Sequence, residues 1–194
     1  RTLFDAQHQQ FLVVGSGDQS IHLLENRDGT LVRTLEKRVP ELGTQYCRSI
    51  TLHQGLLHFV GNEDIVIYRV ERGAVSATGR VIHLPKNYQG SNDIFFLGSR
   101  RGIFTSTPQK VFLFSSLDEL ANGTAQDVSA AFRGTPYSVS RFDGRLWIPE
   151  ITEYSAIRSY PFGGDSISQA SAQTLFDFGE PDSQSMERKR QIPT

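Results

Sequence analysis

Residues 50–70, ITLHQGLLHFVGNEDIVIYRV, contain the pattern that decides the fold. Three short apolar runs are separated in this stretch by two polar turns, at residues 53–55 and 61–64. Runs rich in Val, Ile, Leu and Phe that are bounded by Gly, Asn and Asp are typical of β-strands joined by tight turns. The stretch therefore predicts three consecutive strands.

The same pattern occurs three more times along the chain. The second strand of each unit is predicted to begin at Phe11, Leu56, Ile103 or Leu146, so successive units are separated by 45, 47 and 43 residues. A fourth strand is predicted in each unit, at residues 31–37, 79–84, 125–132 and 172–178. The sequence thus predicts an all-β domain over residues 1–180, with units at 1–38, 39–86, 87–134 and 135–180, followed by a polar tail at 181–194.

A four-stranded unit that recurs every 40 to 50 residues or so is typical of propeller blades, and over residues 1–180 the chain resembles the β-propeller superfamily. The Gly-His and Trp-Asp pairs of WD repeats are absent, and the Gly-Gly pair of Kelch blades occurs only at Gly163-Gly164, in the wrong place. The resemblance therefore implies the fold and no functional residues. Four four-stranded antiparallel blades either close on themselves or form part of a larger ring. The alternative is a β-sandwich, which does not predict a period near 45 residues.

Composition excludes several classes of partner. The 194 residues include 20 Lys plus Arg and 21 Asp plus Glu, a balance that argues against nucleic acid as a partner. No apolar run approaches the ~18 residues of a membrane span, and residues 1–10 lack the apolar core of a signal peptide. We therefore expect a soluble chain, and the sequence leaves its compartment open. The single cysteine, Cys47, excludes an intramolecular disulfide and a thiolate zinc cluster.

Acidic side chains are predicted to gather on one loop face, in the turns between the second and third strands. Converging carboxylates could bind calcium, which takes six to eight oxygen ligands, or a basic peptide. Asp and Glu are also ordinary solvated turn residues, so no cofactor is expected and calcium is the alternative. Trp147, just before one acidic turn, is predicted either to pack in the core or to line a small-ligand pocket. The predicted binding residues on this face are Asp18, Glu63, Asp64, Glu150, Glu153 and Trp147.

The opposite end carries the first-to-second turns, with His8, His53, Arg100, Arg101 and Asp143. Arg100 and Arg101, with nearby Arg72 and Arg80, offer a patch for phosphate or carboxylate, or simply dispersed solubilising charge. No histidine pair has a compact metal-ligand spacing. His53 and His58 lie on adjoining strands of one predicted hairpin and could meet across it.

No catalytic motif is recognisable. Gly15-Ser16-Gly17 is followed by a predicted strand, whereas a nucleophile elbow leads into a helix, and phosphate-binding loops are absent. The sequence favours a non-catalytic interaction scaffold that binds another protein, or further blades of the same assembly, through its loop face or open edges. One alternative is a propeller hydrolase, lactonase or lyase with a metal or small ligand at the central channel. Another is a carbohydrate-binding lectin.

Overall fold

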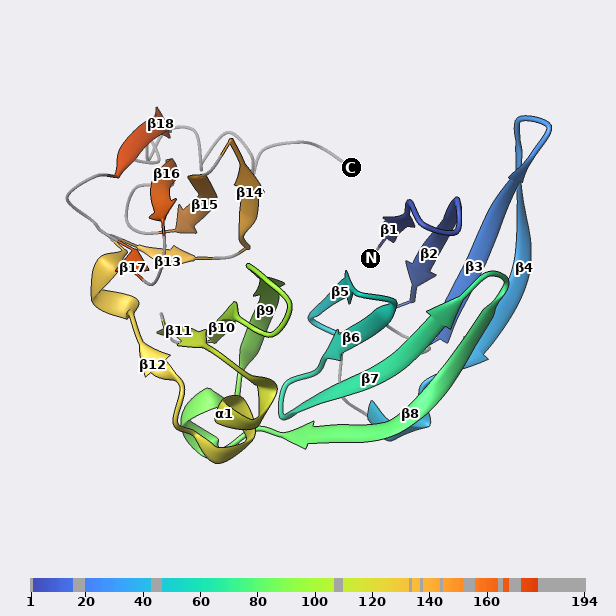
Figure 1. Ribbon diagram of the computed structural model, residues 1–194, viewed down its shortest axis with the longest axis horizontal. Helices are drawn as coiled ribbons and strands as arrows, with labels where there is room; N and C mark the ends of the chain where they lie inside the picture. Colours follow the sequence, from blue (N-terminus) through green and yellow to red (C-terminus); the bar gives the residue numbers. More distant parts are fainter. Residues whose placement is uncertain are drawn as a thin grey trace, which may run out of the picture. The chain divides into compact units, whose positions relative to one another are not determined.

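The computed structural model describes residues 2–15, 20–42, 47–106, 110–132, 134–136, 138–143, 145–151, 156–163, 166–167 and 172–177. Their strands form four antiparallel sheets (Figure 1). No helix within these ranges is both long enough and apolar enough to cross a membrane.

Each of the first three sheets has four strands in the order of the sequence. The first sheet contains β1 (Thr2–Asp5), β2 (Gln10–Val14), β3 (Ser20–Arg27) and β4 (Thr30–Arg38). The second contains β5 (Ser49–His53), β6 (Leu56–Val60), β7 (Asp64–Glu71) and β8 (Ala74–His83). The third contains β9 (Ser91–Phe96), β10 (Gly102–Ser106), β11 (Lys110–Phe114) and β12 (Gln126–Asp127).

The fourth sheet is built around two longer strands. These are β15 (Arg145–Ile151) and β16 (Ala156–Gly163), which pair along six residues each. The short strands β13 (Thr135–Pro136) and β14 (Ser140–Phe142) pair with β15, while β17 (Ser166–Ile167) and β18 (Gln173–Asp177) pair with β16. Two short strands thus flank each side of the central β15–β16 hairpin.

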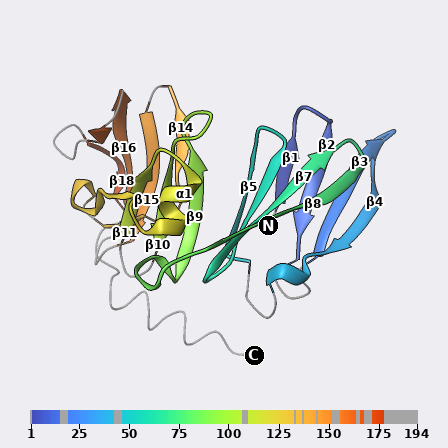
Figure 2. The same cartoon turned by 60° about the horizontal axis from the view of Figure 1, so that its bottom comes forward.

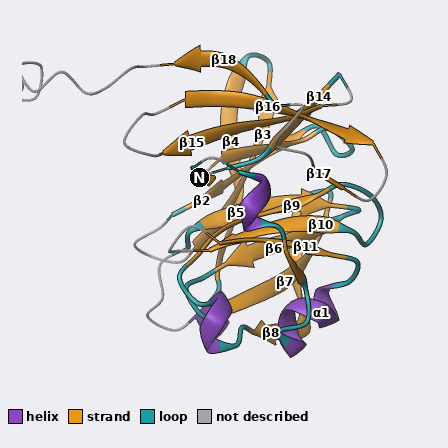
Figure 3. Cartoon of the chain, turned by 90° about the vertical axis from the view of Figure 1, so that its left-hand side faces the viewer, coloured by secondary structure: helices purple, strands orange, loops and turns teal. Residues whose placement is uncertain are grey.

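This repeated meander confirms the predicted all-β, β-propeller fold with four antiparallel blades. A β-sandwich would instead pair strands from distant parts of the chain by Greek-key connections. The strand predicted at residues 125–132 is shorter than expected, because β12 has two residues and a 3-10 turn, η3 (Ser129–Ala131), follows it. The other helical pieces are η1 (Pro40–Leu42), η2 (Lys86–Tyr88) and α1 (Leu117–Asn122), and Figure 3 shows how little of the fold is helical.

The short helix α1 follows Ser116, which precedes Glu119 by three residues, a spacing typical of a helix start. Ser116 is its N-cap residue, and the Glu119 carboxylate accepts a hydrogen bond from the Ser115 backbone N–H at 2.9 Å. Gly123 ends the helix with φ of 69°, a left-handed conformation that glycine adopts without steric cost. The helix packs on β8 and β11, so it joins the second and third blades.

The residues divide into two compact units, Arg1–Asp127 and Val128–Thr194. The first three blades belong to the first unit and the fourth blade belongs to the second.

Within the first unit, the second blade lies between the first and third blades (Figure 2), and side chains on both of its faces are buried. Val66, Tyr68 and Val70 of β7 pack into a core shared with the first blade. Ile65 and Ile67, the alternating residues, pack into a core shared with the third blade. Successive side chains of a strand point to opposite faces, so a strand buried on both sides must be apolar at nearly every position. The run IVIYRV meets this requirement, and this is why residues 50–70 decide the fold.

Candidate functional site

A cleft of about 360 Å³ lies between the second and third blades, wholly within the first unit. One wall comes from β5, β6 and β8, and the other from the end of β9, the turn after it and the start of α1. We call it the interblade cleft. It is lined by His53, Gln54, Leu56, His58, Arg80, Phe96, Ser99, Arg100, Ser116, Leu117 and Asp118.

The β5–β6 hairpin places two histidines on one side of this cleft. Its two-residue turn, Gln54-Gly55, has φ values of 50° and 71°, the left-handed pair that a type I′ turn requires. The turn sets His53 opposite Leu56 and Thr51 opposite His58. Because side chains alternate along strands and match across them, His53 and His58 share a face.

Phe96, the last residue of β9, contacts both histidine rings. The His53 ring stacks on Phe96 with centroids 4.2 Å apart and planes 2° apart, and the His58 ring lies 4.7 Å from it at 47°. Phe96 also meets Phe114 edge-on at 5.7 Å. The Nε2–H of His53 donates to the Ser99 carbonyl at 3.2 Å, which fixes its ring over Phe96. The floor of the cleft is therefore an ordered aromatic surface.

His58 contributes no charge to this floor at neutral pH. His58 is only 2 % exposed, and burial lowers its pKa to about 4. The contact of its Nδ1–H with the Thr51 carbonyl, at 3.4 Å, opposes this shift without cancelling it. The buried histidine behind the floor is thus uncharged.

The rim of the cleft carries the charges. Arg80 Nη2 lies 2.7 Å from Asp118 Oδ1, an ion pair that links β8 to α1. Both side chains are at least half exposed, so the pair contributes at most about 1 kcal/mol to stability. Arg100 is exposed in the turn after β9, and none of the described carboxylates lies within ion-pair distance of it. One rim arginine is thus paired, and the other has no acidic partner in the described part of the chain.

Of the acidic residues predicted on the loop face, the structure describes Glu63, Asp64 and Glu150. Glu63 is exposed in the β6–β7 turn, and its neighbour Asp64 accepts a bond from His83 Nδ1–H at 2.6 Å. Asp18 and Glu153 lie outside the described residues. Within the described ranges, no group of three or more His, Cys, Asp or Glu side chains could hold a metal ion. Calcium binding at these turns stays a prediction.

Glu150 belongs to the second unit and lies within β15 rather than in a turn. It is 1 % exposed, and Arg158 Nη1 lies 2.5 Å from one of its carboxylate oxygens. The Tyr160 hydroxyl donates to the other oxygen. The structure therefore gives this carboxylate two partners from its own blade.

Trp147 lines a second hollow, of about 470 Å³, in the second unit. Trp147 and Pro149 alternate along β15, and Ile157 is opposite Pro149 on β16, so the three share one face of the blade. Ser138 and Ser140 complete the hollow. Trp147 thus lies at an open, largely apolar surface, and whether a small ligand binds there stays a prediction.

Part of the interblade cleft has a signal in the sequence, and part does not. Four of its lining residues are already singled out in the sequence: Arg80 and Arg100 in the arginine patch, and His53 and His58 as a pair that could meet across a hairpin. Phe96 is indistinguishable from a core aromatic when only the strand pattern is considered. The contribution of α1 depends on how the helix packs against β8, which no local pattern predicts.

No protein-family model matches the chain, and no curated protein matches it. Among solved structures it is similar to the WD40 domain of Neurospora crassa Pan2, at 12% identity and a TM-score of 0.55, covering 91% of this chain and 48% of that one. It is also similar to a putative 6-phosphogluconolactonase from Bacteroides uniformis, at 10% identity and a TM-score of 0.56, covering 89% and 55%.

A third similar chain comes from a Saccharomyces cerevisiae complex in which Dbp5 is bound to Nup159 and Gle1, at 9% identity and a TM-score of 0.51, covering 99% and 45%. The chain spans about half the length of the solved chains that it matches. At these identities the similarity shows the fold alone.

Proposed function

We propose that this chain is a non-catalytic protein-interaction scaffold, and that the interblade cleft receives a segment of its partner. The observation that carries the proposal is the combination of an ordered aromatic floor, made by His53 and Phe96, with an arginine rim. Aromatic residues and arginine are enriched where protein interfaces derive most of their binding energy. An apolar centre surrounded by a polar rim is also the usual layout of such interfaces.

One similar structure supports a partner-binding use of this fold. In the yeast complex, Dbp5 is bound to Nup159 and Gle1. Because fold does not determine function, this likeness adds weight to the proposal only together with the cleft.

The test uses a random peptide library displayed on phage and selected against the immobilised chain. The affinity of each selected peptide is then measured by calorimetry for the native protein and for His53→Ala. We expect a loss of about tenfold or more, the effect of removing a central interface residue. His83→Ala is the matched control, because its side chain is 82 % exposed and lies outside the cleft. Absence of selected binders, or equal affinity for His53→Ala, would overturn the proposal.

A metal-dependent hydrolase, lactonase or lyase is the second candidate, supported by the likeness to the putative 6-phosphogluconolactonase. If it holds, calcium or manganese raises the melting temperature, since a ligand that binds the native state stabilises it. The increase would be lost in the Glu63→Gln, Asp64→Asn double variant. A melting temperature unchanged by millimolar calcium or manganese would count against this candidate.

A further inference from the structure

Building on the proposed function, we infer that the cleft selects an acidic, apolar segment: one aromatic or large aliphatic side chain beside a single carboxylate. The apolar side chain would lie on the floor of the interblade cleft, and the carboxylate would bind the Arg100 guanidinium. The inference rests on how charge and apolar surface are divided between floor and rim.

The floor favours an apolar group because it has exposed apolar surface. Leu56, Phe96 and Leu117 are only partly buried there, although they pack against the core of the second and third blades. His58 behind them is neutral near pH 7. A charged group would lose its hydration at this floor without gaining a partner, whereas an apolar group gains from leaving water.

The rim favours one carboxylate rather than several. Of the three charged side chains that line the cleft, Arg80 is neutralised by Asp118 at 2.7 Å, and Arg100 has no acidic partner among the described residues. A guanidinium can donate two parallel hydrogen bonds to one carboxylate. A second acidic group near α1 would find no further unpaired cation among the described residues that line the cleft, because Arg80 is already paired with Asp118. A run of acidic residues is therefore a poorer fit than a single one.

The first experiment compares two displayed peptide libraries that differ in one respect. One contains all amino acids, and in the other Asp and Glu codons are replaced by Asn and Gln codons. We expect binders that depend on His53 from the complete library and few or none from the library without acids. If both libraries give binders that depend on His53 equally often, the acidic part of the inference is wrong while the proposed function stands. If neither library gives binders that depend on His53, the proposed function itself is wrong.

The second experiment is a double-mutant cycle on one selected peptide. Its Asp or Glu is changed to the amide, and the protein is changed by Arg100→Gln, with affinities measured in 50 mM salt. We expect the amide peptide to bind about fivefold more weakly to the native protein, the strength of a solvent-accessible ion pair. On Arg100→Gln the same peptide change should have little effect. Equal effects on both proteins would show that the carboxylate binds elsewhere and would overturn the inference.

Two controls keep the cycle interpretable. Arg72→Gln changes an exposed arginine in the β7–β8 turn, outside the cleft, and should preserve the fivefold discrimination. Arg100 is exposed in a turn, so the Arg100→Gln protein should have the same melting temperature as the native protein. If it does not, Arg100→Lys, which keeps the charge, replaces it and should retain part of the discrimination.

Discussion

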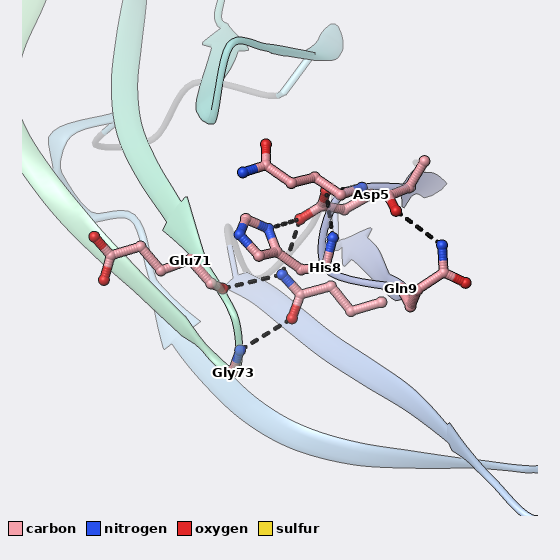
Figure 4. Close-up of polar contacts among 8 residues, drawn as sticks. Asp5, His8, Gln9, Glu71 and Gly73 are labelled. Atoms are coloured by element: carbon pink, nitrogen blue, oxygen red, sulfur yellow. Dashed lines mark hydrogen bonds and ion pairs between the residues drawn. The ribbon is translucent and has the colours of Figure 1, made fainter.

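The backbone N–H of Gly73, in the second blade, donates to Oε1 of Gln10, in the first, at 3.1 Å (Figure 4). The Nε2 group of Gln10 donates at 3.0 Å both to the Asp5 carboxylate and to the Glu71 carbonyl. Gln10 is fully buried, so its amide joins the β1–β2 turn to the β7–β8 turn inside the protein. These bonds fix the edge of one blade on the next.

Replacing Gln10 with Ala should therefore destabilise the protein by about 2 to 4 kcal/mol, because three hydrogen bonds are lost and buried partners are left unsatisfied. Urea unfolding at pH 7 measures the change. Gln7→Ala removes the same amide from an exposed position in the same turn and should alter stability by less than about 0.5 kcal/mol. Similar losses for the two variants would show that the amide of Gln10 does not hold the blades together.

Asp5 should give the protein an acid-sensitive step below about pH 3.8. Burial alone would raise the pKa of this carboxyl, but hydrogen bonds from His8 and Gln10 and the charge of His8 outweigh it, so the net shift is downward. A carboxyl whose pKa is lower in the folded state adds stability above its unfolded pKa of 3.8 and loses it as pH falls through the folded value. In Asp5→Asn, stability at pH 7 should be lower and this step absent. Asp28→Asn, in an exposed turn, should keep the step.

His58 should produce a second, separate pH dependence at higher pH. Its pKa is about 4 in the folded protein and 6.5 in the unfolded chain, so between these values the unfolded chain binds a proton that the folded protein does not. Stability is therefore full above pH 6.5 and falls as pH drops toward 4, by on the order of 3 kcal/mol. His58→Leu should flatten this part of the curve and His83→Leu should leave it. A flat native profile between pH 6.5 and 4 would contradict the burial of a neutral His58.

The sequence predicts those features that depend on local pattern. The alternation in β7 sends Val66 and Tyr68 to one neighbouring blade and Ile67 to the other, so a strand buried on both faces is visible in the order of residues. Likewise the polar pair Gln54-Gly55 between two apolar runs indicates a tight hairpin turn, because glycine there adopts positive φ without steric cost.

Features that depend on long-range pairing are not visible in the sequence. An acidic residue such as Glu150 is expected at a solvated turn, because burying a lone carboxylate is costly. Arg158, on the next strand, removes that cost, and only the register of β15 and β16 shows this. Phe96 is a similar case, since its place beside His53 depends on how two blades pack.

A close approach at Gly102 supports the third blade next to the cleft. A Cβ atom at this position would overlap the Phe114 ring and the Phe95 carbonyl oxygen, and the latter is backbone that cannot move aside easily. Gly102→Ala should therefore cost about 1 to 3 kcal/mol and disturb Phe96, its partner on β9. At Gly98 a Cβ would meet no atom within 4 Å, so Gly98→Ala should be nearly neutral in the same thermal melts. Equal melting temperatures for the two variants would show that the third blade packs differently.

Substitutions at Glu150 distinguish a structural from a ligand-binding role for its carboxylate. Glu150→Gln would leave the Arg158 guanidinium, whose side chain is 9 % exposed, without a counter-charge, and should cost about 3 to 5 kcal/mol in urea unfolding. Replacing both residues, as Glu150→Leu with Arg158→Met, removes the stranded charge and should recover much of that loss. If Glu150 instead served mainly as a calcium ligand, Glu150→Gln would unfold like the native protein without calcium and differ only when calcium is added. A large loss in calcium-free buffer, restored by the double variant, would assign the carboxylate to the core of its blade.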